Sequence, residues 1–364
     1  GSGCFSALGA GTSICRRSRA KADLMRVMQV MAGAPKGGAE TFFTRLAPAL
    51  ARTSITQEVV IRRDADRSAE LRSHGIEPMQ FRFGGPLDCV TGHRLNRAIA
   101  RFAPDILLSW MNRATQFCPV GEHVFAARLG GYYKLENYQR CDHLVGNTKD
   151  ICDYLVEEGW PRSRTWYLPN FVDETSAAAV PRESLNTPEG VPLLLALGRL
   201  HTNKAYDVLL ETLALLPEAY LWLAGEGPLR QTLEAQASRL GITDRVRFLG
   251  WRTDVPALFA ACDLFVCPSR HEPLGNVVIE SWAQRKPLVA AQSQGPAALV
   301  EDGETGLLVP IDDAPRLSAA IARILADADL AEKLVSQGRV TYEADFTEAA
   351  VVSSYMAFFE SITA

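Results

Sequence analysis

The chain has 364 residues, of which 47% are apolar and 22% charged, with 38 Lys and Arg against 42 Asp and Glu. This length predicts two domains, and the composition is typical of a globular protein rather than a disordered or collagen-like chain. The eight cysteines include no Cys-x-x-Cys pair, which argues against a zinc site and a disulfide framework. No apolar run reaches the length of a membrane-spanning helix, so we expect a cytoplasmic protein with reduced thiols.

The charges are distributed unevenly along the chain. Residues 1–170 carry 23 basic and 16 acidic side chains, whereas residues 171–364 carry 15 and 26. Residues 1–24 form a basic tail that we expect to be disordered or derived in part from a tag. A positive N-terminal half suits an anionic partner, such as a phosphorylated lipid or the inner face of a membrane contacted transiently. The alternative, that these arginines only solvate the surface, stays open.

From residue 25 onward, short β-rich runs alternate with amphipathic stretches. Strands are expected at residues 26–31, 58–61, 105–108, 124–127, 142–145 and 166–168, and helices at 38–52 and 149–158. Strand alternating with helix predicts an α/β fold with a doubly wound parallel sheet. We therefore place a first domain at residues 25–170. Residues 171–191 lack apolar periodicity and are interpreted as an interdomain connection.

A second series of the same kind follows this connection. Strands are expected at residues 193–197, 220–224, 246–249, 264–266, 287–290 and 306–309. Helices are expected over residues 314–326, 330–338 and 348–362. A second Rossmann-like domain is therefore placed at residues 192–343, followed by a C-terminal helix at residues 344–364.

Ligands of a doubly wound sheet bind at the carboxyl ends of its strands, so the residues after each strand are the candidates for a site. Gly37 and Gly38 follow the first strand, where they would let backbone N–H groups approach a phosphate. Two glycines in such a turn are also common for structural reasons alone. Arg199 and Lys204 place two cations in one turn after residues 193–197, enough to hold a diphosphate unless both are merely solvated.

Two glutamates follow the strand expected at residues 264–266. Glu272 precedes a glycine turn, and Glu280 lies on the helix after it. Eight residues of helix span about 12 Å, farther than the roughly 5–9.5 Å between the carboxylates of a glycoside hydrolase. The pair therefore favours two separate hydrogen-bonding roles on an elongated, hydroxyl-rich ligand. The N–H groups of Gly275 to Val277 would lie between the two carboxylates.

Two Asp-x-Asp segments have the pattern with which some enzymes hold a divalent metal. Asp64-Ala-Asp66 precedes a predicted helix, and Asp327-Ala-Asp329 lies between two predicted helices. Aspartates in these positions are expected to cap helices. We therefore predict no metal site and no cofactor.

Together these motifs resemble those of the retaining family-4 glycosyltransferases, which have the GT-B fold. The resemblance covers nearly all of residues 25–364 and rests on Gly198-Arg199-x4-Lys204, Gly225-Glu-Gly-Pro-Leu-Arg230, Phe248-Leu-Gly250, Glu272-x7-Glu280 and Gly303-Glu-Thr-Gly-Leu-Leu-Val-Pro310. It implies two Rossmann-like domains that face each other across a cleft. It also implies a C-terminal helix that crosses back to the N-terminal domain.

The resemblance implies a role for each candidate residue. Arg199, Lys204 and Glu272 would be the catalytic set, in which the two cations hold the donor diphosphate and Glu272 positions the donor sugar. Glu280 would bind the ribose hydroxyls. The remaining donor contacts would come from Gly37 and Gly38 over the phosphates, Gly250 and Trp251 near the base, and the backbone of Leu274, Gly275, Asn276 and Val277.

One departure from the family pattern concerns the N-terminal domain. Many relatives carry a histidine near the reacting sugar, but the matching stretches, residues 109–113 and 128–132, contain none. Asn112 and Arg113 are the side chains that could line the same part of the cleft. Which residue takes the place of that histidine stays open.

The predicted function is metal-independent transfer of a hexosyl-type sugar with retention of configuration. The donor would be a nucleotide-diphosphate sugar, a UDP-sugar first and a GDP-sugar second. The acceptor would be a hydroxyl of a glycan or glycolipid in lipopolysaccharide or exopolysaccharide synthesis, and no nucleic acid is involved. A nucleotide-sugar epimerase on the same fold and a non-catalytic sugar-nucleotide-binding subunit are the alternatives. We find no motif for the extra acid–base carboxylates of an epimerase. The presence of Arg199, Lys204 and Glu272 argues against a site that has lost its catalytic activity.

Overall fold

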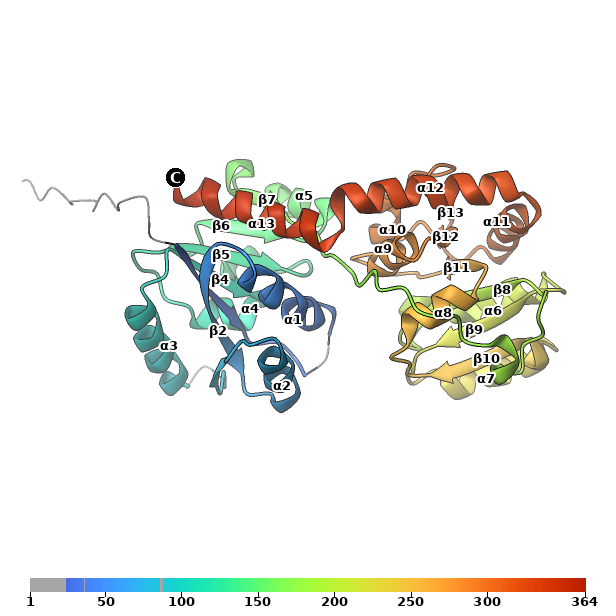
Figure 1. Cartoon of the computed structure of the whole chain (residues 1–364), viewed down its shortest axis with the longest axis horizontal. Helices are drawn as coiled ribbons and strands as arrows, with labels where there is room; N and C mark the ends of the chain where they lie inside the picture. The colour runs from blue at the N-terminus through green and yellow to red at the C-terminus, as the bar shows by residue number, and fades with distance from the viewer. Residues whose placement is uncertain (1–23, 36, 86–87) are drawn as a thin grey trace, which may run out of the picture.

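A computed structural model of the chain describes residues 24–35, 37–85 and 88–364. Two parallel sheets, each flanked by helices, lie one after the other along the long axis of the molecule (Figure 1). This is the fold class expected from the sequence. The basic tail predicted for residues 1–24 lies, apart from Leu24, outside the described residues.

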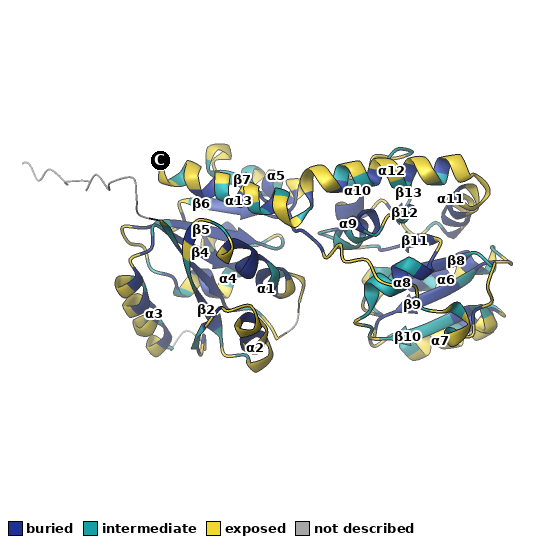
Figure 2. Ribbon diagram, in the orientation of Figure 1, coloured by how far each residue is buried: buried dark blue, intermediate teal, exposed yellow. Residues whose placement is uncertain are grey.

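The N-terminal sheet has seven strands in the order β3-β2-β1-β4-β5-β6-β7. The strands are β1 (Met25–Met31), β2 (Ile55–Arg62), β3 (Met79–Phe81), β4 (Ile106–Trp110), β5 (Val124–Leu129), β6 (His143–Gly146) and β7 (Thr165–Tyr167). The helices beside them are α1 (Gly38–Ala51), α2 (Ala65–Ser73), α3 (Cys89–Phe102), α4 (Met111–Phe117) and α5 (Lys149–Glu157). The central strands β1, β4 and β5 are largely buried because helices cover both faces, as the dark blue strands of Figure 2 show. Their buried residues are apolar apart from Gln29, Ser109 and Arg128.

The C-terminal sheet has six strands in the order β10-β9-β8-β11-β12-β13. The strands are β8 (Leu193–Leu197), β9 (Tyr220–Ala224), β10 (Val246–Gly250), β11 (Leu264–Cys267), β12 (Leu288–Ala291) and β13 (Leu307–Val309). The helices are α6 (Tyr206–Ala214), α7 (Arg230–Arg239), α8 (Val255–Ala261), α9 (Asn276–Ala283), α10 (Gln294–Leu299), α11 (Ala314–Ala326) and α12 (Ala328–Asp345). Short 3-10 turns lie at η3 (Arg182–Leu185) and η4 (Thr202–Lys204).

The helix expected over residues 330–338 is longer than predicted, because α12 continues to Asp345. Gly338, which suggested a helix end, lies inside α12. A Cβ at this position would lie 2.4 Å from Cδ1 of Trp282, so the glycine makes room for the indole ring. Its small size therefore serves packing rather than helix termination.

The last helix, α13 (Glu348–Thr363), returns to the N-terminal domain as the resemblance implied (Figure 1). Val351, Tyr355, Phe358 and Phe359 of α13 belong to the same buried cluster as residues of β1, β2, β4 and α1. The chain therefore passes between the domains twice, once through the residues that connect β7 with β8 and once from α12 to α13. Both crossings lie along one side of the molecule.

Candidate active site

The strand order reverses at one place in each sheet, between β1 and β4 and between β8 and β11. At such a point the loops after the two strands diverge and leave a crevice at the carboxyl edge of the sheet. The loop after β8 carries Arg199 and Lys204, and the loop after β11 carries Glu272. The sheet topology therefore brings together the residues expected to hold a diphosphate and a sugar.

Lys204 and Glu272 form an ion pair between these two loops. Glu272 is 9% exposed, and the side chains of both residues are largely buried. The attraction within such a pair is screened less than on the surface, and either charge alone would be left buried without compensation. Gly198 has φ +143, and a Cβ there would lie 3.0 Å from Cε of Lys204. The glycine thus leaves space for the lysine stem to cross the end of β8.

The turn that carries Lys204 is fixed by residues that the sequence did not single out. Arg270 donates to both carboxylate oxygens of Asp207, at 2.9 and 2.7 Å, and pairs with Asp312 at 2.6 Å. It also donates to the carbonyl oxygen of Thr202 in η4 at 3.0 Å. His201 caps η4, since its Nδ1 accepts from the N–H of Asn203 at 3.3 Å. In the sequence, the only sign of this was an arginine two residues before Glu272.

Arg199 differs from Lys204 in having an exposed side chain. Across the described residues it forms no ion pair or side-chain hydrogen bond, so its guanidinium remains available to an anion. An arginine presents a planar fork to phosphate oxygens, whereas a lysine presents a point charge. The two cations thus offer different kinds of contact to one anionic ligand.

The loops after β8, β9 and β10 are held tightly against one another. Gly198 N–H donates to Ala224 O at 3.0 Å, and Gly225 N–H donates to Gly250 O at 2.8 Å. A Cβ at Gly225 would lie 1.9 Å from Gly198 O, so only glycine fits this close approach. Gly250 has φ +68, and Trp251 beyond it is 69% exposed. The structure thus places the two residues expected near the base on the same edge as Arg199 and Lys204.

Glu280 lies on α9, the helix that begins after Gly275. Burial raises the pKa of its carboxyl to about 7, an effect that Arg45 and Lys204 oppose and Glu272 reinforces. Arg45 belongs to α1, so a residue of the N-terminal domain lowers the pKa of a carboxyl in the C-terminal domain. Glu280, Glu272 and Lys204 are therefore close enough for their charges to influence one another.

The loop of residues 268–275, the sugar loop expected from the family resemblance, depends on glycine at two positions. Gly275 has φ +66, and Leu274, Asn276 and Val277 flank it at the start of α9. Gly295 N–H donates to Glu272 O at 2.7 Å, and a Cβ at Gly295 would lie 2.5 Å from Gly275 N. The segment after β12 therefore packs against the backbone of residues 272–275 and holds it in place.

The glycine loop after β1 encloses a carboxylate of its own chain. Glu40 is 8% exposed, and its Oε1 accepts from the N–H of Ala34 at 2.7 Å. A Cβ on Gly33 or Gly37 would lie 2.1 or 2.3 Å from a carboxylate oxygen of Glu40. Gly37 thus makes room for Glu40, a structural role, whereas a Cβ on Gly38 would have nothing within 4 Å.

Both Asp-x-Asp segments begin helices, as predicted. Asp64 accepts from the N–H of Arg67 at 2.9 Å, and Asp327 accepts from the N–H of Leu330 at 3.0 Å. Arg67 in turn donates to Ala34 O at 2.5 Å, which anchors the glycine loop. In the N-terminal domain, Asn112 follows β4, and its buried Oδ1 has no hydrogen-bond partner among the described residues.

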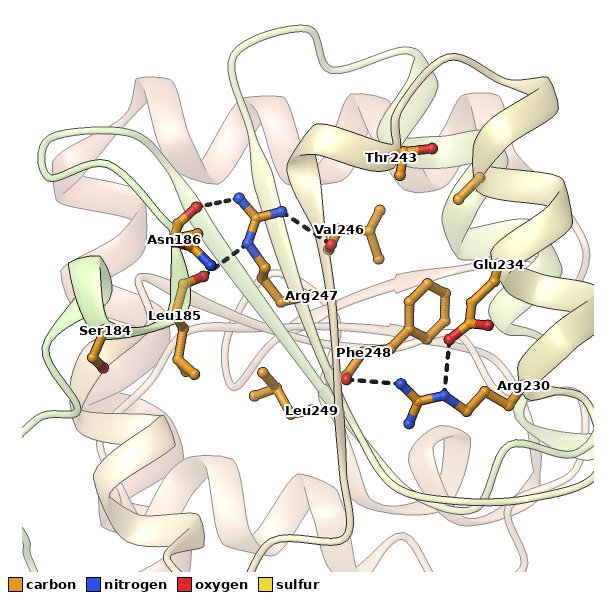
Figure 3. A pocket seen from close by; sticks show the side chains of 11 residues that line it. Ser184, Leu185, Asn186, Arg230, Glu234, Thr243, Val246, Arg247, Phe248 and Leu249 are labelled. Carbon is orange, nitrogen blue, oxygen red and sulfur yellow. Dashed lines mark hydrogen bonds and ion pairs between the residues drawn. The ribbon is translucent and has the colours of Figure 1, made fainter.

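A hollow of about 470 Å³ lies beside β10 and η3 (Figure 3). Its arginines are already committed, because Arg247 donates to Leu185 O at 2.8 Å and Arg230 donates to Glu234 Oε1 at 2.8 Å. None of Arg199, Lys204, Glu272 and Glu280 lines it. The hollow is therefore separate from the candidate site.

Comparison with known proteins identifies the family of the chain. Residues 180–341 match the sequence model described as glycosyl transferases group 1, and residues 36–176 match that of glycosyltransferase family 4. The lipopolysaccharide core biosynthesis glycosyltransferase LpsE of Rhizobium meliloti is 37% identical over 88% of this chain and 95% of its own length. LpsD of the same organism, also a lipopolysaccharide core biosynthesis glycosyltransferase, is 34% identical over 92% of this chain and 98% of its own length.

Among solved structures, Anabaena Alr3699/HepE in complex with UDP aligns with a TM-score of 0.82 over 93% of this chain and all of that chain. A glycosyltransferase from Rickettsia africae aligns with the same TM-score over 93% of this chain and 98% of that chain. Their sequence identities are 22% and 19%, so they establish the shared fold alone.

Proposed function

Because the chain belongs to glycosyltransferase family 4, we propose that it transfers a hexosyl-type sugar from a nucleotide-diphosphate sugar to a hydroxyl of a glycan or glycolipid. The observation that carries this proposal is the buried Lys204–Glu272 pair beside the exposed Arg199, at the point where the strand order of the C-terminal sheet reverses. Cations and a carboxylate at one crevice suit a ligand that is anionic at one end and rich in hydroxyls at the other.

The leaving group would be a nucleoside diphosphate. As its bond to the sugar breaks, negative charge grows on the diphosphate oxygen, where Arg199 and Lys204 would stabilise it electrostatically. Glu280 would accept hydrogen bonds from the ribose hydroxyls. We propose a UDP-sugar first and a GDP-sugar second. The complex of Alr3699/HepE with UDP, a protein of the same fold, supports this order.

We propose that the sugar is transferred with retention of configuration. Glu272 is the carboxylate expected at the donor sugar, and its ion pair with Lys204 makes it a poor nucleophile. A route in which the acceptor attacks the same face of the sugar, with the leaving phosphate as base, requires no covalent intermediate. We further propose that turnover needs no divalent metal, since the two cations would neutralise the diphosphate.

For the acceptor we propose a growing lipopolysaccharide or related polysaccharide, which reaches the enzyme at an anionic membrane surface. The names of LpsE and LpsD support the class of product. The surface of α3 supports the proposed contact with an anionic membrane. Its residues Arg94 and Arg97 are exposed and have no ion-pair partner among the described residues. Val90, on the same side of α3, is 58% exposed. No helix of the described residues is long and apolar enough to cross a membrane.

The experiment that tests the reaction is incubation of the full chain with UDP-, GDP- and ADP-sugars, with and without lipopolysaccharide core acceptors. Without an acceptor, slow hydrolysis of one donor is expected. With an acceptor, the sugar should be transferred to its hydroxyl and the nucleoside diphosphate released faster. Interconversion of the sugar without release of nucleotide would identify an epimerase. Binding of nucleotide without any turnover would identify a non-catalytic subunit.

A further inference from the structure

Arg128 is a charged residue in the otherwise apolar strand β5, and only 1% of it is exposed. Its guanidinium carbon lies 4.7 Å from the ring centroids of Phe42 and of Trp110. Within the described part of the chain, no carboxylate lies within ion-pair distance of it. Burial of a charge costs several kcal/mol unless polar groups compensate it. The neutral groups that Arg128 contacts must therefore supply this compensation.

The two hydrogen-bond partners of Arg128 lie on the two segments that cross between the domains. Its Nε donates to Oη of Tyr355 in α13 at 2.8 Å, and its Nη2 donates to Oδ1 of Asn170 at 2.5 Å. Asn170 is 4% exposed and lies between β7 and β8. One buried cation thus joins both crossings to the N-terminal sheet.

Asn170 extends this connection into the other domain. Its Nδ2 donates to Oδ1 of Asn276 at 3.1 Å, and Asn276 is the first residue of α9. Two residues earlier, Leu274 packs against the buried cluster formed by β1, β4, β5 and α5 of the N-terminal domain. The loop proposed to hold the donor sugar is therefore attached to the N-terminal domain through one hydrogen bond and one apolar contact.

We infer that Arg128 and Asn170 are positioning residues that set the orientation of the donor-sugar loop relative to the N-terminal domain, where the acceptor would bind. Neither residue would touch a substrate, since both are buried behind the loop. The inference rests on the proposed function. Arg199, Lys204 and Glu280 do not depend on Asn170, so the nucleotide would still bind if this connection were broken. Alignment of the sugar with the acceptor would be lost.

Asn170→Ala is the variant that breaks the connection. We expect kcat to fall about tenfold, while the donor KM and the affinity for UDP stay within about twofold, because misalignment affects the reacting geometry more than binding. Asn276→Ala should have the same effect. The double variant should have no lower kcat than either single one, because both substitutions remove the same hydrogen bond, the one between Asn170 and Asn276. Asn170→Asp keeps an acceptor for Arg128, and the Asn276 amide can turn to donate to it, so this variant should recover turnover.

Tyr355→Phe is the matched control, because it removes the other hydrogen bond of Arg128 without touching the connection to α9. It should lower Tm and leave kcat unchanged. Amide hydrogen exchange of residues 277–280, measured without substrate, should accelerate in Asn170→Ala and not in Tyr355→Phe. Hydrogen exchange therefore tests the inference without relying on the proposed reaction. The proposed reaction is refuted by a different result, the absence of turnover in the wild-type chain.

Three results would overturn the inference. The first is a wild-type kcat in Asn170→Ala, and the second is a hundredfold loss in the double variant, which would show independent effects. The third is unchanged hydrogen exchange at the start of α9. A lower Tm in Asn170→Ala with unaltered kcat would assign Arg128 and Asn170 a purely structural role.

Discussion

At the scale of single residues, the two cations of the candidate site differ in what their removal leaves behind. Arg199→Ala removes an exposed side chain, so stability should change by less than about 0.5 kcal/mol. Lys204→Ala leaves the buried Glu272 without its partner and should destabilise the protein by about 1–3 kcal/mol. Both variants should lose about 2–4 kcal/mol of transition-state stabilisation. Urea unfolding and initial rates of the two variants check these expectations. Wild-type turnover in both variants would show that Arg199 and Lys204 do not bind the diphosphate.

Glu280 should make donor binding depend on pH near neutrality. Its carboxyl has a pKa of about 7 because of burial. The ionised form accepts a stronger, charge-assisted hydrogen bond from a ribose hydroxyl at each of its two oxygens. The donor KM should therefore fall as the pH rises from 6 to 8. A KM that does not change over this range would contradict the ribose role of Glu280.

The same pKa has a consequence for stability. The folded state holds the proton of Glu280 more tightly than the unfolded chain does, so the free energy of unfolding decreases as pH rises from about 4.5 to about 7. Glu280→Gln removes this loss and should be more stable than the wild type at pH 8, by up to about 3 kcal/mol. Unfolding at pH 5 and pH 8 measures the difference. Equal stability of the two proteins at pH 8 would show that the carboxylate is well solvated.

Sequence patterns identified some functional residues and missed others. The two groups differ in how far away in the sequence their partners lie. Lys204 and Glu272 lie in loops that follow strands, and Glu280 lies on the helix after one of these loops. A doubly wound sheet places its ligand contacts at this edge, so sequence position made the three residues candidates, and the family resemblance implied their roles. Arg128 and Asn170 act through partners that are 227 and 106 residues away in the sequence. Only a lone charge in an apolar strand indicated Arg128. The tertiary structure was needed to show what it contacts.

At the scale of secondary-structure elements, the segment after β12 should be intolerant of side chains. In Gly295→Ala, the new methyl group would lie 2.6 Å from Glu272 O and 2.5 Å from Gly275 N, so the sugar loop must move. We expect a destabilisation of about 1–3 kcal/mol and weaker donor binding. Gly92→Ala in α3 is the control, since its Cβ meets nothing within 4 Å and should stabilise the helix by about 0.5–1 kcal/mol. Similar effects of the two substitutions would contradict this account of the loop.

Elements with a strong apolar period were predictable, and short or weakly apolar ones were not. The expected strands at residues 193–197 and 220–224 coincide with β8 and β9. Strand β3 has only three residues and was not predicted. Helix α3 was also missed, although its buried residues Thr91, Leu95, Ala98 and Phe102 have the spacing of one helix face. In α12, a glycine that packs against Trp282 was mistaken for a helix end. The extent of α12 depends on tertiary packing, which a local sequence pattern does not contain.

At the scale of the whole molecule, the exposed arginines of α3 should bring the N-terminal domain to an anionic membrane. Binding of the full chain to vesicles with acidic lipids should be measurable at low salt and weak near 0.5 M, where screening is strong. Exchanging Arg94 and Arg97 for Glu should abolish binding, while Arg316→Glu on α11 should not. Equal binding of both variants would leave the arginines of α3 as solvating side chains.

The central claim is that the crevice beside β8 and β11 binds the nucleoside diphosphate of the donor through Arg199 and Lys204, without a metal ion. Calorimetric titration of UDP into the full chain, in excess EDTA, tests it most directly. We expect binding to the wild-type protein, weaker binding of GDP, and loss of UDP binding in the double variant Arg199→Ala/Lys204→Ala. Binding that requires added Mg²⁺ or Mn²⁺, or that survives loss of both cations, would contradict the account.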